Sequence, residues 1–243
     1  MVDNKLAIKY MRDLKNVDRS LTDTIRNSNL KDLSVDTVEN FIDSTLKDGI
    51  LKDIPILATV IGIGNTMSSI KNALFLKKII SFLSNIADVA PDQRRKMVDS
   101  IDESQKYKMK VGEKLVYIID KCDDHMDAKY VAQLFNAFVE EKISYDEFLR
   151  GSRIIQDIFL ADLEYFLSLD ITEFEVTGSS EEFPHEDQFP LINVGICGFG
   201  YDRVTLQKAY LHSDEQEIRG GDAVVWVTSI GKKLKEVLRL ETN

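Results

Sequence analysis

The sequence contains few of the residues that mark disordered, secreted or disulfide-bonded proteins. It has four prolines, twelve glycines and two cysteines in 243 residues. So few prolines and glycines leave little room for a long disordered linker, and 44% hydrophobic with 30% charged residues is typical of a folded globular protein. Cys122 and Cys197 lie far apart in the sequence, which excludes a disulfide framework and predicts two reduced thiols.

Long apolar runs are also missing. The opening residues, MVDNKLAIKYMRDLK, mix charged and apolar side chains and contain no signal-peptide core. The uncharged run at residues 54–70 has seventeen residues, including Pro55, whereas a transmembrane helix needs roughly twenty apolar ones. We therefore predict a cytoplasmic protein, and peripheral attachment to a membrane stays open as an alternative.

The sequence also lacks clear signatures of a catalytic, cofactor-binding or metal-binding site. The glycines at 62–64 lack the Gly-Lys-Ser/Thr of a P-loop, and those at 195–200 do not open an evident helix. Residues 136–147 resemble an EF-hand loop but place Phe138 at a ligand position, so we predict a tight turn between helices. The acidic residues at 123–127 have no second ligand cluster, and we interpret them as a helix end with Asp127 as the next cap. No catalytic residue, cofactor or metal ligand is predicted, although distant residues can still assemble a catalytic site.

The net charge of −10 is distributed unevenly. Residues 48–100 hold seven bases and five acids, whereas residues 101–170 and 171–243 each carry a net charge of −6. Such an acidic chain opposes binding to nucleic acid. We interpret the main basic cluster as the solvated face of two helices, and the alternative is a surface that contacts anionic lipid. The cluster consists of Lys71, Lys77, Lys78, Arg94, Arg95 and Lys96.

The first half of the chain is predicted to be helical. Apolar residues recur at helical spacing over 35–46, with Ser34 as a cap and Gly49 at the end. Pro91 suits the first turn of a helix, and a further helix is predicted over 111–122.

Two more helices are predicted in the stretch that follows. One of them runs through Val131 and Phe138. The sequence Ser144-Tyr-Asp-Glu147 is a capping box, and the helix it starts can continue to about residue 169.

The helix predicted over 74–87 has a wide apolar face with lysines opposite. Our first interpretation is a buried helical hairpin formed with residues 54–63, and the alternative is a helix that inserts into a membrane or lies on its surface. In that alternative the predicted membrane or partner contact comprises Phe75, Ile79, Phe82, Ile86, Lys71, Lys77 and Lys78.

The residue pattern changes after residue 170, from helical spacing to strand-like and glycine-rich segments. A strand-like segment at 171–178 and a glycine-rich apolar segment at 191–200 precede AVVWVTSIGKKLKEVLRL, which predicts a strand followed by an amphipathic helix. We therefore predict a mainly α protein with two domains, an all-helical domain at 1–170 and a small α/β domain at 171–243.

The last seventy or so residues resemble a winged-helix domain. VVWVTSIGKKLKEVL is similar to the last wing strand, threonine, glycine and final helix of that fold, and LINVGIC is similar to the end of its recognition helix. The wing loop would then span 212–222. The general layout also resembles uncharacterised bacterial helical proteins and the abortive-infection alpha family of phage-defence proteins, which implies action at or near a membrane.

We therefore expect a non-enzymatic bacterial protein that acts by association with a protein partner or an anionic membrane surface, in phage defence if the resemblance holds. One alternative is a DNA-binding regulator, although the segment at 181–195 has four acids and no Lys or Arg, whereas DNA affinity depends on basic side chains. The other alternative is a structural subunit of a complex, and self-association into a homo-oligomer also fits.

Overall fold

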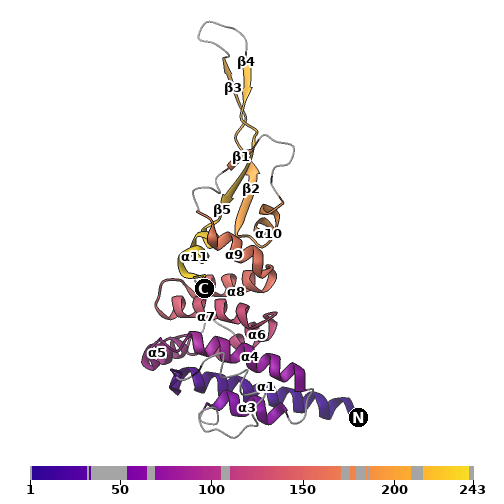
Figure 1. Cartoon of the computed structure of the whole chain (residues 1–243), viewed down its shortest axis with the longest axis vertical. Coiled ribbons are helices and arrows are strands. Elements are labelled where there is room, and N and C mark those ends of the chain that lie inside the picture. The colour runs from indigo at the N-terminus through magenta and orange to yellow at the C-terminus, as the bar shows by residue number, and fades with distance from the viewer. Residues whose placement is uncertain are drawn as a thin grey trace. The chain divides into compact units, whose positions relative to one another are not determined.

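The computed structural model describes residues 2–31, 33, 54–64, 69–104, 110–170, 176–178, 184, 186–208 and 216–240. These residues are mainly helical and carry two small antiparallel sheets (Figure 1). Contacts divide the chain into two compact units, Met1–Gln156 (unit 1) and Asp157–Asn243 (unit 2), which are described separately.

Unit 1 is a set of helices around a shared apolar core. Helix α4 packs against α7, while α1 packs against α3, α5 and α6. The predicted helix at 35–46, with Ser34 and Gly49 at its ends, lies outside the described residues. The described helices are α1 (Val2–Asn27), α3 (Pro55–Gly64), α4 (Ser69–Asn85), α5 (Pro91–Asp102), α6 (Val111–Lys121), α7 (His125–Val139) and α8 (Tyr145–Asp157).

Aromatic side chains form the centre of this core. The ring of Phe135 in α7 lies 5.7 Å from that of Phe82 in α4 and 5.9 Å from that of Phe148 in α8. All three side chains are fully buried. Tilted and edge-on ring pairs at such distances contribute free energy beyond the burial of their area, so these rings hold three helices together.

Two helices begin where the sequence predicts. Pro91 opens α5, and Ser144 and Glu147 form the capping box: the Ser144 amide donates to Glu147 Oε2 at 2.7 Å. Pro55 likewise opens α3, although the sequence analysis did not predict a helix start there. The cap of α7 is Asp124, one turn before the predicted Asp127. Asp124 Oδ1 accepts from the amides of Met126 and Asp127, whereas Asp127 accepts from the Asp123 amide. The prediction of Asp127 as the cap was therefore wrong.

The tight turn between α7 and α8 is built on a left-handed residue that is not glycine. Glu141 has φ of 59°, and its amide donates to the carbonyl of Phe138. The next amide, that of Lys142, donates to Ala137 at 2.8 Å. These two bonds form a Schellman motif, in which the left-handed position normally favours glycine.

The described residues of unit 2 form three short helices and two sheets. Strands β1, β5 and β2 form an antiparallel sheet in the order β1-β5-β2, and β3 pairs with β4. The predicted helix from Ser144 towards residue 169 is two helices, α8 and α9, although no proline or glycine lies at 158–159. The elements are α9 (Leu160–Ser168), β1 (Val176–Gly178), α10 (Gln188–Asn193), β2 (Cys197–Tyr201), β3 (Thr205–Lys208), β4 (Gln216–Arg219), β5 (Ala223–Val227) and α11 (Ser229–Val237).

Helix α9 belongs to unit 2, whereas the sequence predicts a boundary near residue 170. It packs against α10, and Lys235 of α11 donates to the carbonyls of Phe166 and Leu169 at the C-terminal end of α9. A lysine suits this position because the last carbonyls of a helix have no partner within the helix.

The predicted strand and helix at the C-terminal end are confirmed as β5 and α11. Between them, Thr228 Oγ1 accepts from the Gly231 amide and donates to the carbonyl of Gly195 at 2.7 Å. A Cβ on Gly231 would lie 2.3 Å from the carbonyl oxygen of Ile196, so glycine is required where α11 approaches the start of β2.

We predict that Glu141→Gly stabilises unit 1. A left-handed conformation costs a non-glycine residue about 1–2 kcal/mol, and the greater freedom of glycine in the unfolded chain offsets about half of that gain, leaving about 0.5–1 kcal/mol. Urea unfolding followed by far-UV circular dichroism measures the change in the helical unit. Trp226, the single tryptophan, reports unit 2 by fluorescence, and its transition is expected to stay in place.

Two control variants distinguish relief of backbone strain from the loss of a charge and from a general effect of introducing glycine. Glu141→Gln removes the charge and keeps the strain, so it is expected to change little. Lys96→Gly introduces glycine at an exposed position inside α5 and is expected to cost about 1 kcal/mol. An equal gain from Glu141→Gln would show that charge and not backbone strain is responsible.

Candidate functional site

The apolar residues predicted to contact a membrane or a partner lie in the core of unit 1. Ile79 and Phe82 of α4, and Ile86 just after its end, are 0% exposed, and Phe82 contacts Phe135 of α7. Phe75 is half-buried. On α3, Ile56 and Leu57 are also fully buried, which agrees with the buried interpretation of this segment. Contact between the α4 face and a membrane would require this core to open, so that contact stays a prediction.

The basic cluster predicted as a solvated face does not form one surface. Lys78 Nζ donates to the carbonyls of Asp120 and Cys122, at 2.9 and 2.6 Å, and so caps the end of α6. Arg94 is fully buried and donates to the carbonyls of Val89 and Ser28. Arg94 therefore corrects the solvated interpretation, because its charge ties the end of α1 to the α4–α5 connection. Lys77 is half-buried, and the side chain of Lys71 lies outside the described residues.

Neither cysteine is suited to nucleophilic chemistry. Both thiols are free and buried. Burial raises the pKa of Cys122 to about 12, with Asp127 adding to the shift, and burial raises that of Cys197 to about 11. The thiolate is the reactive form of cysteine, so both side chains are unreactive at neutral pH.

The part of the chain that the structure describes contains neither a membrane-spanning helix nor a cluster of metal ligands. No helix there is long and apolar enough to cross a membrane. No group of three or more His, Cys, Asp or Glu side chains in that part of the chain could hold a metal ion.

A polar cavity of about 530 Å³ lies among α1, α5 and α6. The close approach of α6 to α1 depends on Gly112, where a Cβ would lie 2.0 Å from Thr22 Oγ1. Asp102 accepts from the Val111 amide at the start of α6 and from Arg26. The side chains that line the cavity are charged apart from one threonine: Lys15, Asp18, Arg19, Thr22, Asp23, Arg26, Asp102, Lys110 and Glu113.

The electrostatics of this cavity fit a charge network between helices. Burial raises the pKa of Asp18 above its ordinary value, and the carboxylates of Glu113 and Asp102 raise it further. Arg26 bridges Asp99 and Asp102 at 2.6 and 3.2 Å. Neither a thiol nor an imidazole is among the lining residues.

Exposed apolar side chains gather in unit 2. Eleven large apolar side chains are exposed among the described residues, and nine of them belong to unit 2, which is the smaller unit. Scattered exposure is normal on a protein surface, but a concentration of this kind marks an interaction site. The nine are Phe159, Tyr165, Phe189, Phe199, Tyr201, Val204, Leu206, Trp226 and Leu240.

Four of these side chains follow one long β-hairpin. Tyr201 pairs with Ala223 in the first ladder and Thr205 pairs with Arg219 in the second, so both ladders share one register with no inserted residue. The ladders are separated by Gly220 and Gly221, with φ of 88° and 89°. A Cβ on Gly220 would lie 2.1 Å from the carbonyl oxygen of Arg203, so only glycine fits where the strands pass each other.

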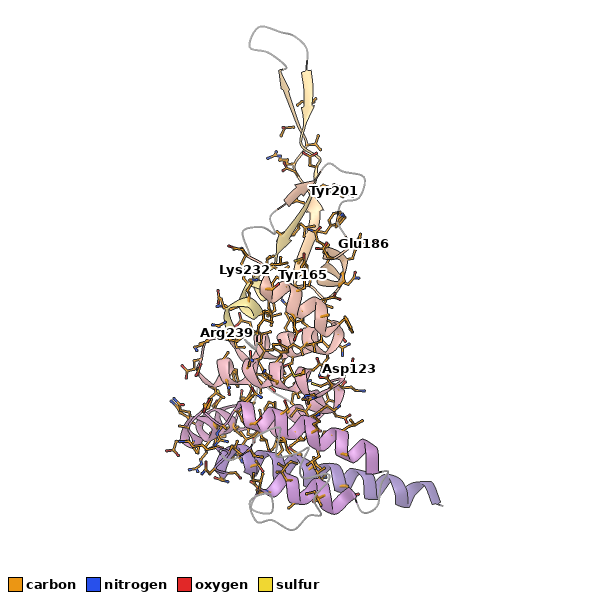
Figure 2. The ribbon with its side chains drawn as sticks, viewed as in Figure 1. Asp123, Tyr165, Glu186, Tyr201, Lys232 and Arg239 are labelled. Atoms are coloured by element: carbon orange, nitrogen blue, oxygen red, sulfur yellow. The ribbon has the colours of Figure 1, made fainter. Side chains whose placement is uncertain are left out.

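One face of β2 begins in the core of unit 2 and emerges into solvent. Exposure rises from 2% at Cys197 to 38% at Phe199 and 73% at Tyr201, three residues that alternate along the same face. Phe199 and Tyr201 touch each other edge to face, with ring centroids 5.5 Å apart. Figure 2 labels Tyr201, near the end of β2 from which the hairpin continues into β3.

Past the level of Gly220 and Gly221, the exposed apolar residues of the first hairpin strand have even instead of odd residue numbers. Val204 is 59% exposed and Leu206 is 67% exposed. In Figure 1, β2 is drawn to the right of β5, whereas β3 is drawn to the left of β4, so the two strands of the hairpin cross in this view between the ladders. Val204 and Leu206 lie on the strand that continues from Phe199 and Tyr201. We call Phe199, Tyr201, Val204 and Leu206 the hairpin stripe.

The opposite face of β2 is covered by a single ring. Trp226 lies across Gly198 and Gly200, where an added Cβ would come within 2.5 and 3.2 Å of its indole. Gly198 and Gly200 therefore serve close packing against Trp226. Our sequence reasoning missed the hairpin stripe; the alternation of Val204 and Leu206 beside a glycine pair was the signal available.

We predict that Asp18→Asn stabilises unit 1 at neutral pH. A carboxyl whose folded pKa is raised lowers stability while it is ionised, and the penalty disappears as the pH falls through the folded pKa towards about 4. The gain, measured by urea unfolding with circular dichroism detection, is therefore expected to shrink on acidification. The control is Asp23→Asn, at an exposed residue that lines the same cavity. It should raise the free energy of unfolding by less than Asp18→Asn does. A gain that persists in acid would refute the electrostatic explanation.

Comparison of the chain with models of protein families, with curated proteins and with solved structures found no match.

Proposed function

We propose that this protein acts by binding a partner protein through the hairpin stripe of unit 2, and not by catalysis. One observation carries the proposal: exposed apolar side chains at Tyr201, Val204 and Leu206 follow one another along a hairpin whose β2 strand begins in the core of unit 2. Exposed apolar surface is costly in water, and its concentration on a projecting element is typical of an interaction site.

The arrangement of unit 2 supports a winged-helix-like interpretation. The strand order β1-β5-β2, with α10 before β2 and α11 after β5, agrees with the layout expected from the sequence. In this proposal β3 and β4 form the wing. The resemblance to the abortive-infection alpha family makes phage defence the proposed biological context.

Protein is a better-supported partner than DNA. The described hairpin residues 202–208 and 216–222 hold three acids and three bases, which gives no basic surface. The residues just before α10 include Glu186 and Asp187, whose charges repel phosphate. DNA affinity rests largely on Lys and Arg contacts to phosphates, and neither element supplies a set of them.

Site-specific photocross-linking in the native host cells tests the proposal. A photoreactive phenylalanine analogue replaces Tyr201 in one variant and Leu206 in another, both in the full chain. Because both positions lie on the stripe, we expect each to give a discrete cross-linked product.

The control places the same analogue at Tyr117, an exposed aromatic residue of unit 1. We expect no discrete product from that position. Equal products from all three positions, or none from the two stripe positions, would show that the stripe is not a binding surface.

A further inference from the structure

The net charge of the chain lies entirely in the unit that carries the hairpin stripe. Unit 1, residues 1–156, holds 24 Lys and Arg and 24 Asp and Glu, so its net charge is zero. Unit 2, residues 157–243, holds seven bases and seventeen acids, which accounts for the whole of −10. A charge of this size on a small unit attracts cationic molecules and repels anionic ones as they approach.

Most bases of unit 2 lie at its C-terminal helix and not on the hairpin. Four of the seven occur in α11 or just after its end. Among them, Lys235 donates to carbonyls of α9, and Arg239 donates to the carbonyls of Glu236 and Leu238. The rest of the unit, residues 157–228, therefore holds fifteen acids and only three bases, a net charge of −12.

Acidic residues also accompany the stripe itself. Residues 202–222 hold five acids and three bases. Asp202 and Asp222 are exposed between the two ladders of the hairpin, and therefore between the two halves of the stripe. Glu186 and Asp187 are exposed just before α10, the helix that packs against β2. Exposed apolar side chains and negative charge thus occur together in this part of unit 2.

We propose that the partner bound by the hairpin stripe is a basic protein surface, on which Lys and Arg side chains surround an apolar patch. The inference rests on the proposed function and names the chemistry of the partner. Opposite charges guide the two surfaces together and fix their orientation. The apolar side chains of the stripe then leave water when the surfaces touch, which supplies the favourable free energy of binding.

The same charge opposes three other classes of partner. Nucleic acid and the anionic surface of a membrane are both negative, so unit 2 repels them. A second copy of the chain would bring together two units that each carry −10. A basic protein is the class of macromolecule to which both the apolar stripe and its acidic surroundings are complementary.

The exposed rings of the stripe add a preference for cationic side chains. A Lys or Arg side chain that packs on an aromatic face is attracted by the electrons of the ring. Rings of this chain already accept cations, since Lys114 Nζ lies 5.4 Å from the centre of the Tyr117 ring. Tyr201 is 73% exposed, so a cation of the partner can reach its ring.

Photocross-linking in the native host cells, with charge variants of the full chain, tests the inference. The photoreactive analogue replaces Leu206, and Glu186→Lys together with Asp222→Lys reverses two exposed acids of unit 2. Because two attractive charges become repulsive, we expect the yield of the discrete product to fall at least about tenfold. The matched control, Asp88→Lys with Asp120→Lys, makes the same change in net charge at exposed acids of unit 1 and should leave the yield unchanged.

Salt provides a second test that needs no substitution of an acid. In a lysate of the same cells, raising NaCl from about 0.1 M to about 1 M shortens the Debye length from about 10 Å to about 3 Å. We expect the yield to fall, whereas a contact held by apolar burial alone would keep its yield. Mass spectrometry of the product identifies the cross-linked peptide of the partner, which should be rich in Lys and Arg. Circular dichroism and Trp226 fluorescence establish that each charge variant is folded.

The outcomes separate this inference from the proposed function. A product that responds neither to salt nor to the acids of unit 2, or equal losses in the two double variants, overturns the basic partner and leaves the stripe as a binding surface. A cross-link to an acidic peptide or to a second copy of the chain has the same consequence. No discrete product from either stripe position overturns the proposed function, and this inference falls with it. A salt-sensitive product on a basic peptide supports both.

Discussion

Helix α4 places its apolar side chains against α7, and the rest of unit 1 is organised around that contact. Ile79, Phe82 and Leu83 of α4, and Ile86 just after its end, are all fully buried. Each such side chain contributes about 1.5–3 kcal/mol by leaving water, or about 6–12 kcal/mol for the four. A whole domain is typically stable by about 5–15 kcal/mol, so exposing these four side chains would consume most of that stability. In the resting structure, most of the exposed large apolar side chains of the described residues therefore belong to unit 2 and not to this face.

The sequence predicted local features of the fold well and three-dimensional choices less well. Pro91 and the capping box at Ser144 act on the nearest turn, so their effect can be read from a few residues. Arg94 could not be placed in this way. Its charge, next to Arg95 and Lys96, is typical of a solvated face, but its guanidinium satisfies carbonyls of two segments distant in the sequence. Burial of a charge depends on such partners, and a linear pattern does not reveal them.

The hairpin stripe could not be predicted for a similar reason. A strand is recognised by alternation, and the apolar residues here change from odd to even positions between Tyr201 and Val204. In the sequence alone, that change breaks the alternation expected of a single strand. Gly220 and Gly221 lie opposite this change in the partner strand, and their positive φ differs from regular strand geometry. The sequence shows the glycine pair but not the backbone conformation that it adopts.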